Sequence, residues 1–430
     1  MKIEQLHALF LERSGVITDT RKIEENSLFF ALKGDNFNGN SFADLALKSG
    51  AAYAIIDEEQ FKLNERTLLV DDVLQTLQEL ANFHRKHLGI PIIALTGSNG
   101  KTTTKELINQ VLSKKFKTVA TVGNLNNHIG VPLTLLKMNA STELGIVEMG
   151  ANHLKEIDNL ARIAEPNYGY ITNFGKAHLE GFGSEEGVVQ GKSELYHVIK
   201  ENAGLLFING DDPKQVDISQ NILQYSFGTA ASNNLKITYP NANPYAKIEA
   251  EGQTIQSHLI GHYNATNIAA AFAIGHYFKV SDQKISEAIG EYVPANNRSQ
   301  IIKQEKQTII LDAYNANPTS MEAALENFSQ LDAKRKVVFL GDMFELGATA
   351  EKEHQYITQL ALSKNFEAVV LLGSNFGKHK IEAPNAFYFE DFQSLKEKGI
   401  DLKIKEQLQD AHVLIKGSRG MALERILDIL

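Results

Sequence analysis

Residues 96–104 read T-G-S-N-G-K-T-T-T, and the types and spacing of these residues suit the binding of a nucleoside triphosphate. Glycine lets the backbone approach phosphate oxygens closely, because it carries no Cβ. The loop and the start of a following helix would direct backbone N–H groups at the same oxygens. Lys101 is placed to reach the outer phosphates, and Thr102 to ligate Mg²⁺. The candidate ATP-binding residues of this stretch are Thr96, Gly97, Ser98, Asn99, Gly100, Lys101, Thr102 and Thr103.

A strand and a helix must flank this loop. Residues 90–95 form an apolar run typical of a buried strand, and the apolar residues at 107, 108, 111 and 112 have the spacing of a buried helix face. The usual P-loop has four residues between its glycines, whereas only Ser98 and Asn99 separate Gly97 from Gly100. The motif alone therefore leaves an ordinary strand-to-helix turn as an alternative.

Two later strands end in residues that suit a metal site. Glu148 ends the apolar run in G-I-V-E-M-G at residues 145–150, and His178 closes I-T-N-F-G-K-A-H at residues 171–178. A carboxylate at the end of a buried strand is costly unless it has a partner. Both side chains would lie beside Thr102 if the strands are neighbours, although Mg²⁺ prefers oxygen ligands. The alternatives are a helix-capping or salt-bridged glutamate and an ordinary loop histidine.

Length and composition limit the class of protein. The chain has 430 residues, of which 43% are hydrophobic and 22% charged, as in ordinary globular proteins of two or three domains. The formal net charge of −9 provides no basic field for nucleic acid. No apolar run is long enough to span a membrane, and the N-terminus lacks a signal-peptide core. The absence of cysteine fits a cytoplasmic protein without disulfides or thiolate chemistry.

Strand-like and helix-like runs alternate along the chain, which predicts an α/β fold with largely parallel sheets. We expect three domains, at residues 1–86, 87–299 and 300–430, with a helix at 74–88 leading out of the first. The polar segment 294–299 is the expected hinge before the third domain. The candidate strands are residues 27–32, 52–56, 92–95, 118–121, 145–149, 168–172, 205–209, 308–311, 337–340, 368–372 and 412–415.

The shortened loop, with Thr96 before its first glycine and Asn99 before its second, resembles the ATP loop of the Mur ligases. These enzymes form amide bonds in bacterial cell-wall synthesis. In that family a glutamate in an E-M-G-type motif and a histidine in an A-H-L-type motif bind Mg²⁺, and Glu148 and His178 fall on those positions. The family's carbamylated lysine falls on Lys192 of G-K-S-E-L-Y, where the carbamate is an anionic ligand for a second Mg²⁺. Without the resemblance, Lys192 would pass for a surface lysine.

The resemblance assigns further roles. It implies catalytic roles for Lys101, Lys192 and His178, and metal binding by Thr102, Glu148, His178 and carbamylated Lys192. Two asparagine clusters also match the family, although a loop and a helix cap are their structural alternatives. In G-N-L-N-N-H-I-G at residues 123–130, Asn126 and Asn127 fall on the substrate path. In G-H-Y-N-A-T-N at residues 261–267, Asn264 and Asn267 share a helix face, and Asn267 falls beside the adenine.

Motifs in the third domain resemble those of one branch of the family in particular. D-A-Y-N-A-N-P at residues 312–318, L-G-D-M-F-E-L-G at 340–347 and K-G-S-R-G-M-A-L-E at 416–424 resemble the branch that adds D-alanyl-D-alanine to UDP-N-acetylmuramoyl-tripeptide. Asp312 ends a strand, where a carboxylate can bind ribose hydroxyls. Arg298 matches an arginine that reaches the ATP phosphates when the last domain closes. Further substrate-binding candidates are Asn315, Lys416 and Arg419; the last two could otherwise be cations near a helix start, which the helix dipole disfavours.

Residues 18–33 resemble the family's uridine-nucleotide domain, with Thr18, Arg21 and Lys33 as candidate contacts. The resemblance thus implies a small N-terminal α/β uridine-nucleotide domain, a central P-loop-type parallel-sheet ATPase domain and a C-terminal Rossmann-like domain. It implies a cytoplasmic, monomeric ligase that uses ATP and Mg²⁺, with no nucleic acid and no membrane insertion. The alternatives are a folylpolyglutamate-type ligase, a small-molecule kinase or P-loop ATPase, and a catalytically silent binding protein. The third residue of the tripeptide, diaminopimelate or lysine, stays open.

Overall fold

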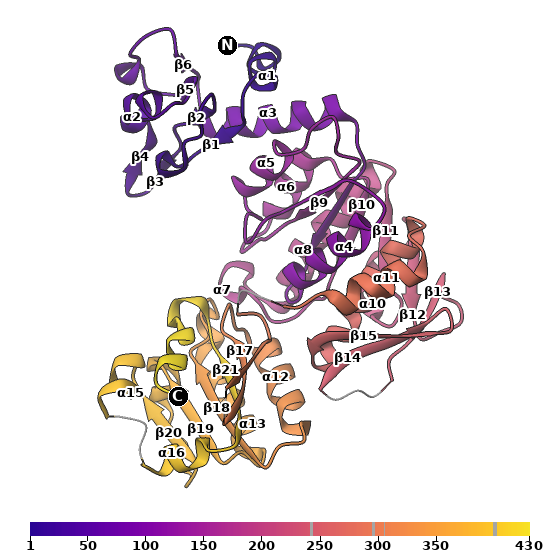
Figure 1. Ribbon diagram of the computed structural model, residues 1–430, viewed down its shortest axis with the longest axis vertical. Coiled ribbons are helices and arrows are strands. Elements are labelled where there is room, and N and C mark those ends of the chain that lie inside the picture. The colour runs from indigo at the N-terminus through magenta and orange to yellow at the C-terminus, as the bar shows by residue number, and fades with distance from the viewer. Residues whose placement is uncertain (241–243, 295–296, 305, 399–401) are drawn as a thin grey trace.

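The computed structural model describes residues 1–430 except 241–243, 295–296, 305 and 399–401. Within the described residues the chain forms three α/β units, which follow one another in chain order along the molecule (Figure 1). The expected three-domain α/β fold is confirmed. Residues 295–296 of the expected hinge lie outside the described residues. In the described part of the chain, no helix has both the length and the apolar character needed to cross a bilayer.

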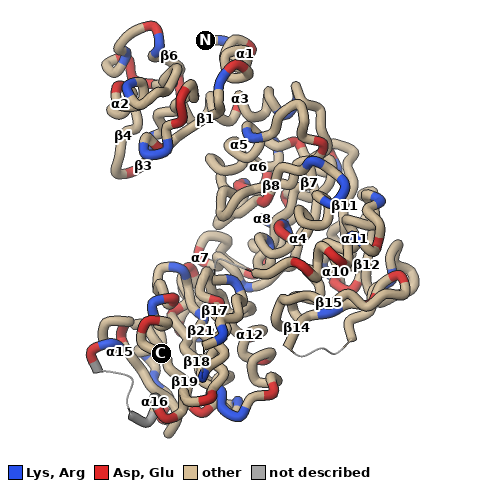
Figure 2. Tube along the Cα trace, viewed as in Figure 1, with Lys and Arg blue, Asp and Glu red and all other residues tan. Residues whose placement is uncertain are grey.

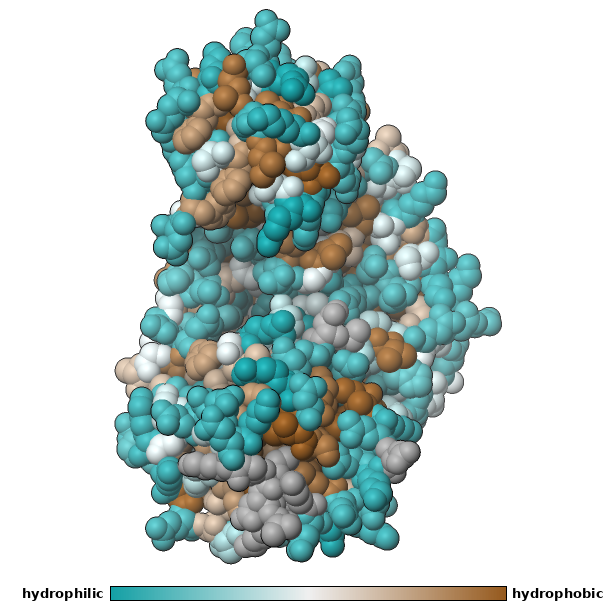
Figure 3. Space-filling model, turned by 60° about the vertical axis from the view of Figure 1, so that its left-hand side comes forward, coloured by the Kyte–Doolittle hydropathy of each residue, from teal (hydrophilic) through white to brown (hydrophobic). Residues whose placement is uncertain are grey.

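The N-terminal unit has a parallel sheet with strand order β1-β2-β5-β6. Its β2 and most of β5 are buried, because α2 covers one face of the sheet, while α1 and α3 (Val73–Leu88) cover the other. In the space-filling view this unit is a separate lobe, set off from the central unit by a waist (Figure 3). Its elements are α1 (Ile3–Leu11), β1 (Val16–Ile17), η1 (Thr20–Lys22), β2 (Leu28–Phe30), β3 (Lys33–Gly34), β4 (Phe37–Asn38), η2 (Gly39–Phe42), α2 (Ala43–Lys48), β5 (Tyr53–Ile56), η3 (Glu59–Phe61) and β6 (Thr67–Leu69).

Helix α3 (Val73–Leu88) links the first two units, as the sequence predicts. The Asp72 side chain caps its start by accepting a hydrogen bond from the backbone N–H of Gln75 at 2.7 Å, and Gly89 ends it with a left-handed φ of 63°. The buried face of α3 packs against α1 of the first unit and against α5 and α6 of the second. This shared packing fixes the N-terminal unit to the central one.

The central unit is built on a sheet with strand order β15-β14-β13-β12-β11-β10-β7-β9-β8, parallel from β8 to β13 and antiparallel beyond. The five strands expected here are β7 to β11, whereas β12 to β15 were not expected. The strands are β7 (Ile92–Thr96), β8 (Thr118–Ala120), β9 (Leu144–Glu148), β10 (Tyr168–Ile171), β11 (Leu205–Asn209), β12 (Leu223–Gly228), β13 (Leu235–Thr238), β14 (Tyr245–Ala250) and β15 (Gln253–Ile260).

Helices cover both faces of this sheet, so β7 is buried throughout. Ile93 and Leu95 of β7 belong to the core beneath α4, α10 and α11, while Ile92 and Ala94 belong to the core beneath α3, α5, α6 and α8. The helices are α4 (Lys101–Ser113), α5 (Gly130–Leu135), α6 (Glu156–Ala164), α7 (Leu179–Phe182), α8 (Glu185–Glu201), α9 (Pro213–Ile218), η4 (His262–Asn264), α10 (Ala265–Tyr277) and α11 (Asp282–Glu291).

The C-terminal unit has strand order β16-β17-β21-β18-β19-β20, with β16 antiparallel to β17 and the other pairs parallel. Helices α12, α13 and α14 cover one face, and α15, α16 and η7 cover the other. The elements are β16 (Gln300–Gln304), β17 (Gln307–Asp312), α12 (Pro318–Gln330), β18 (Arg335–Gly341), η5 (Gly347–Thr349), α13 (Ala350–Ser363), β19 (Ala368–Leu372), α14 (Ser374–Lys378), β20 (Ala386–Phe389), α15 (Phe392–Lys398), α16 (Leu402–Leu408), β21 (Ala411–Lys416), η6 (Arg419–Met421) and η7 (Leu423–Asp428).

The loops at the carboxyl ends of both large sheets line one cleft. Loops after β7, β9 and β10 contribute from the central unit, and the loop after β17 and the end of β21 contribute from the C-terminal unit. Lys and Arg are interspersed with Asp and Glu over all three units, rather than gathered on one (Figure 2). The two sheets thus position strand-end polar residues on opposite walls of the cleft, where ligands of open α/β sheets bind.

Candidate active site

The loop between β7 and α4 has a shape that only glycine allows at two positions. Gly97 has a φ of 143° and Gly100 a φ of 78°, both in the region that L side chains rarely adopt. A Cβ on Gly97 would collide with Oγ1 of Thr172, and one on Gly100 would lie 2.7 Å from Oδ1 of Asn267. The ordinary-turn alternative does not require such close packing around both glycines. The loop therefore has the tight geometry of an anion-binding turn at a helix start.

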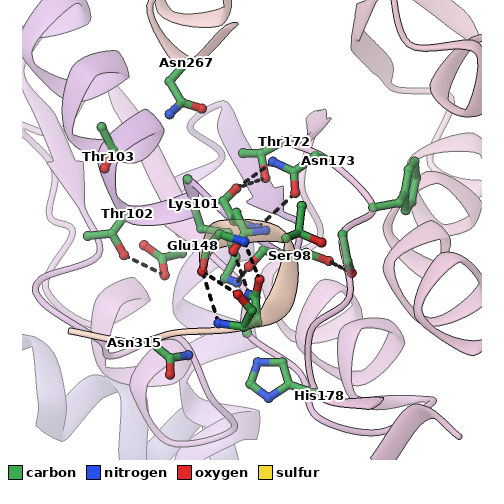
Figure 4. A pocket seen from close by; sticks show the side chains of 18 of the residues that line it. Ser98, Lys101, Thr102, Thr103, Glu148, Thr172, Asn173, His178, Asn267 and Asn315 are labelled. Atoms are coloured by element: carbon green, nitrogen blue, oxygen red, sulfur yellow. Dashed lines mark hydrogen bonds between the residues drawn. The ribbon is translucent and has the colours of Figure 1, made fainter. Parts of the chain in front are cut away.

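The segment after β10 holds this loop in place (Figure 4). The backbone N–H of Asn99 donates to Asn173 Oδ1 at 3.0 Å, and Thr172 Oγ1 donates to the Asn99 carbonyl at 2.6 Å. Ser98 Oγ donates to the Gly175 carbonyl at 2.8 Å. Thr172 and Asn173 were not predicted as site residues from the sequence, although both belong to the I-T-N-F-G-K-A-H stretch at the end of an expected strand. Their contacts make the loop rigid before any ligand binds.

Lys101, the first residue of α4, folds back over the loop. Its Nζ donates to the carbonyls of Gly97 at 2.7 Å and Ser98 at 3.3 Å. Burial lowers the pKa of Lys101, the carboxylate of Glu148 opposes that shift, and the Arg298 cation adds to it. The ammonium group has no carboxylate hydrogen-bond partner among the described residues, so an anionic ligand in the cleft would supply one.

Glu148 is almost fully buried, with 1% of its surface exposed. Its Oε1 accepts hydrogen bonds from Thr102 Oγ1 at 3.2 Å and from Asn126 Nδ2 at 2.7 Å. Within the described residues its Oε2 is buried and has no hydrogen-bond partner. A buried carboxylate oxygen without a partner is costly, and a divalent cation would satisfy it. Neither the helix-cap nor the salt-bridge alternative finds a partner for Glu148 among the residues that the structure describes, so the donor set fits a cation beside Thr102.

The protein's own donors for such a cation are few. No group of three His, Cys, Asp or Glu side chains with metal-binding spacing occurs in the part of the chain that the structure describes. A threonine hydroxyl and one carboxylate are nevertheless a common set for Mg²⁺, which completes its shell with substrate phosphates and water. The site therefore fits Mg²⁺ bound together with a nucleotide, rather than a metal held by protein alone.

His178 follows β10 and Glu148 ends β9, and the sheet order places β7 between these two strands. His178 lines the cleft at the start of α7, with a left-handed φ of 55°. Its Nδ1 contacts Oε2 of Glu345, in the C-terminal unit, at 2.5 Å. Glu148 and His178 thus both line the cleft that contains the phosphate loop, and the C-terminal unit also contacts the histidine.

Lys192, on α8, is fully buried, so the surface-lysine alternative is wrong. Its Nζ donates to the Ala151 carbonyl at 3.1 Å and lies 4.9 Å from the ring centroid of Phe182. Burial first, and the Lys101 cation second, hold the pKa of Lys192 well below its usual range. Ala151 lines the cleft, whereas Lys192 lies just behind it. A lowered pKa favours the uncharged amine, which is the form that can act as a nucleophile.

Polar residues of the C-terminal unit form the opposite wall. Lys416 is buried, and its Nζ pairs with Asp312 Oδ2 at 2.5 Å, so the anion beside Lys416 is a residue of this chain. The other oxygen, Asp312 Oδ1, accepts from the backbone N–H of Ser299 at 3.0 Å. The guanidinium carbon of Arg298 lies 3.6 Å from the Tyr314 ring centroid. Tyr314 was not singled out from the sequence, although it stands within D-A-Y-N-A-N-P.

Asn267 connects the cleft to α4. Its Oδ1 accepts from Thr104 Oγ1 at 3.1 Å, and its Nδ2 donates to Asn264 Oδ1 at 2.8 Å. The side chain of Asn264 makes no capping hydrogen bond to α10 and donates instead to the Ile260 carbonyl at 2.7 Å. The two asparagines thus form a buried polar pair at the edge of the cleft, as their spacing predicts.

The cleft has a volume of about 1230 Å³. Thr96 and Gly97 lie beneath its surface, Arg419 lies outside it and pairs with Glu424, and Thr18, Arg21 and Lys33 lie in the N-terminal lobe. In that lobe Arg21 pairs with Asp19 and Lys33 with Asp57. The predicted residues that the cleft brings together are Ser98, Asn99, Gly100, Lys101, Thr102, Thr103, Asn126, Asn127, Glu148, His178, Asn267, Arg298, Asp312, Asn315 and Lys416.

A rigid phosphate loop, a hydroxyl–carboxylate pair and a second domain across one cleft define the class of enzymes that bind a nucleoside triphosphate between domains. Comparison with known families is consistent with this class over most of the chain. Residues 12–85 match the Mur ligase family catalytic domain, residues 95–275 the Mur ligase middle domain, and residues 297–419 the Mur ligase glutamate ligase domain.

Individual relatives extend the match. The UDP-N-acetylmuramoyl-tripeptide–D-alanyl-D-alanine ligase of Bacillus subtilis strain 168 is 35% identical over 423 residues, covering 96% of this chain and 92% of the relative. The crystal structure of MurF from Acinetobacter baumannii is similar with a TM-score of 0.87 and 29% identity, over 96% of this chain and 92% of that one. MurF from Thermotoga maritima in complex with ADP has a TM-score of 0.83 and 25% identity, over 98% and 97%. The chain belongs to the Mur ligase family.

Proposed function

We propose that this protein is an ATP-dependent ligase that joins D-alanyl-D-alanine to UDP-N-acetylmuramoyl-tripeptide in peptidoglycan precursor synthesis. The observation that carries the proposal is the full-length similarity to a ligase of that name, with the quoted motif residues gathered at one cleft. Retention of the N-terminal lobe argues against a folylpolyglutamate-type ligase, which begins near the phosphate loop.

The chemistry needs an activated acid. A carboxylate is a poor acyl donor, because oxide would have to leave. Transfer of the γ-phosphoryl group from ATP to the tripeptide carboxylate gives an acyl phosphate and ADP. The free amine of D-alanyl-D-alanine then attacks the acyl carbon through a tetrahedral intermediate, loses a proton and expels phosphate. The products are the pentapeptide precursor, ADP and phosphate.

The residues of the cleft suit the first step. The loop N–H groups and Lys101 bind and neutralise phosphate oxygens while negative charge shifts between them. Thr102 and Glu148 would hold Mg²⁺, with His178 as a further ligand. When bound, Mg²⁺ supplies charge neutralisation at the phosphates. Asn267 would lie beside the adenine, Asp312 beside the ribose, and Arg298 beside the phosphates.

Lys192 suits carbamylation. Its buried amine can add to CO₂ in the uncharged form, which the lowered pKa favours, forming an N–C bond and releasing one proton to give an anionic carbamate. The carbamate would provide oxygen ligands for a second Mg²⁺ from just behind Ala151. This role explains why a lysine is buried without a carboxylate hydrogen-bond partner among the described residues.

The remaining residues suit substrate binding. Asn126, Asn127, Asn315 and Lys416 line or flank the path across the cleft, Arg419 stands near its rim, and Thr18, Arg21 and Lys33 would contact the uridine nucleotide in the N-terminal lobe. The two-domain cleft would exclude water, which otherwise hydrolyses the acyl phosphate. The proposal includes a monomer in the cytoplasm, as the family resemblance and the cysteine-free sequence favour.

An ADP-release assay tests the function directly. With ATP and Mg²⁺ and no other nucleophile added, we expect sustained ADP release only when both UDP-N-acetylmuramoyl-tripeptide and D-alanyl-D-alanine are present, and a pentapeptide product by mass spectrometry. Running the assay with diaminopimelate- and lysine-containing tripeptides identifies the third residue. Hydroxylamine should trap an acyl hydroxamate when D-alanyl-D-alanine is left out. A stable phosphorylated product without hydroxamate would identify a kinase instead.

A further inference from the structure

The contact between His178 and Glu345 joins a candidate metal ligand to the other domain. His178 Nδ1 and Glu345 Oε2 are 2.5 Å apart, and an ionised carboxylate can only accept, so Nδ1 carries the proton. In the neutral imidazole this leaves Nε2 with a free lone pair. No hydrogen bond reaches Nε2 of His178 from any residue that the structure describes. The ring is therefore held by one nitrogen with the other available to the cleft.

The backbone conformations of His178 and Glu345 favour this contact. His178 and Glu345 both have left-handed φ angles, of 55° and 61°, which cost about 1 kcal/mol or more each for residues other than glycine. The backbone N–H of Glu180 donates to the Glu345 carbonyl at 3.1 Å. Gly347 packs so closely that a Cβ there would lie 3.3 Å from Cα of Glu180. Main chain as well as side chain thus fixes Glu345 against His178.

A second contact ties the same segment to the C-terminal unit. The backbone N–H of Lys176 donates to Thr319 Oγ1 at 3.0 Å, and Lys176 Nζ pairs with the buried Glu353 at 2.9 Å. On its other side the segment accepts a hydrogen bond from Ser98 through the Gly175 carbonyl. The His178 segment therefore lies between the phosphate loop and the docked C-terminal unit, in contact with both.

We propose that Glu345 is a positioning residue that holds the His178 imidazole with Nε2 directed to the metal of the cleft. A carboxylate that accepts from the other ring nitrogen fixes the tautomer and orientation of metal-binding histidines generally. Because Glu345 belongs to the C-terminal unit, the metal side of the cleft is complete only when that unit is docked. The inference rests on the proposed function, in which Mg²⁺ binds with ATP, and adds that domain docking and metal affinity are coupled.

Metal binding tests the inference without turnover. Mn²⁺ serves as the probe, titrated into the full-length protein with a non-hydrolysable ATP analogue and followed by the electron paramagnetic resonance of free Mn²⁺. We expect Glu345→Ala to weaken Mn²⁺ binding about tenfold, and Glu345→Gln to weaken it less, because the amide oxygen still accepts from Nδ1. Glu351→Ala removes an exposed carboxylate of the same unit and should change the affinity less than twofold.

A double-mutant cycle separates positioning from a general loss of fold. In the His178→Gln background, adding Glu345→Ala should have no further effect on Mn²⁺ affinity. Unchanged or tighter Mn²⁺ binding by Glu345→Ala would overturn the inference, since a carboxylate that competes with the metal for His178 gives the opposite sign. An equal loss in the His178→Gln background would overturn it as well.

The same measurements distinguish failure of the Glu345 positioning role from failure of the proposed function. If the wild-type protein binds Mn²⁺ with the nucleotide and Glu345→Ala does the same, the positioning role is wrong while the ligase proposal stands. If the wild-type protein binds no Mn²⁺ with the nucleotide, the positioning role and the Mg²⁺ part of the proposed function are both wrong. The ADP-release assay then decides whether ligation itself occurs.

Discussion

Asn317 Nδ2 donates a hydrogen bond to Asn99 Oδ1 across the cleft, with the two atoms 2.7 Å apart. Asn99 belongs to the phosphate loop of the central unit, and Asn317 caps α12 of the C-terminal unit by accepting from the backbone N–H of Ser320 at 2.9 Å. One side chain thus starts a helix and contacts the loop that would bind the triphosphate. Docking of the C-terminal unit and the shape of that loop are therefore linked.

Asn317→Asp tests this link. The aspartate keeps the capping acceptor for Ser320, but it turns an acceptor toward Asn99 and adds negative charge near the phosphate site. We expect the KM for ATP to rise roughly tenfold, or about 1.4 kcal/mol, with little change in thermal stability. Steady-state kinetics and a thermal unfolding curve check both parts. Unchanged kinetics would mean that the contact plays no part in nucleotide binding.

Gly97→Ala should remove nucleotide binding. The new Cβ meets Thr172, and the φ of 143° strains any L residue, at a cost of about 1–3 kcal/mol. Gly15→Ala is a matched control, because Gly15 has a φ of 145° and open space where its Cβ would lie. Isothermal titration with a non-hydrolysable ATP analogue should show binding by Gly15→Ala and none by Gly97→Ala. Equal binding by the two variants would refute the packing argument.

Lys192→Ala should lose ligation by at least about a hundredfold, because the carbamate cannot form. Short carboxylic acids such as acetate should restore part of the activity by replacing the missing anion. Lys192→Arg should be inactive without rescue, since its guanidinium stays charged and fills the space. Lys200→Ala, at an exposed lysine near the end of the same helix, is the control. Normal turnover by Lys192→Ala would exclude the role.

Stability should fall in mild acid because of two buried histidines between the first two units. His7 Nε2 on α1 lies 3.0 Å from His84 Nδ1 on α3, and His84 Nε2 lies 2.8 Å from the Met138 carbonyl. Burial, followed by the charges of His84 and His87, lowers the pKa of His7 to about 4. Burial also lowers the pKa of His84. Both rings are therefore neutral in the folded protein at pH 7.

Proton uptake by the unfolded chain explains why the free energy of unfolding falls in acid. As the pH falls, the unfolded chain binds protons at about pH 6.5, before the folded one, so the unfolded state is favoured. The stability present above pH 6.5 is lost progressively as the pH falls toward 4, by up to about 3 kcal/mol for His7. Denaturant unfolding at pH 7.5, 6 and 5 measures this loss. His7→Gln, which can still donate to His84, should show a weaker pH dependence than the wild-type protein.

The strands of the two large sheets could be predicted from the sequence where helices cover both of their faces. Residues 205–209 and 368–372 were expected as strands with the bounds that β11 and β19 have, because a doubly covered strand is a continuous apolar run. The strands β14 and β15, at the antiparallel end of the central sheet, were missed. Their more buried and more exposed residues alternate, and an alternating segment carries a weaker signal than a continuous apolar run.

The phosphate loop could also be predicted from the sequence. Its motif depends on local backbone shape and on the close spacing of Gly97, Gly100, Lys101 and Thr102 along the chain. Glu148 could be named from its strand end, since parallel strands bring their carboxyl ends to one edge. His178 stands beyond the end of β10, at the start of α7, so its role was predicted from the family resemblance. The contacts of Asn317 with Asn99 and of Glu345 with His178 could not, because each joins residues more than 160 positions apart.

The sequence by itself determined the α/β alternation, the phosphate loop and the family, since these depend on local apolar periodicity and on short motifs. Only the tertiary structure decided that Lys192 is buried behind Ala151, that Lys416 faces Asp312, and that a carboxylate of the last domain contacts His178. The physical reason is that burial and charge pairing depend on which elements pack together. That packing is set by contacts distant in sequence, which no local pattern records.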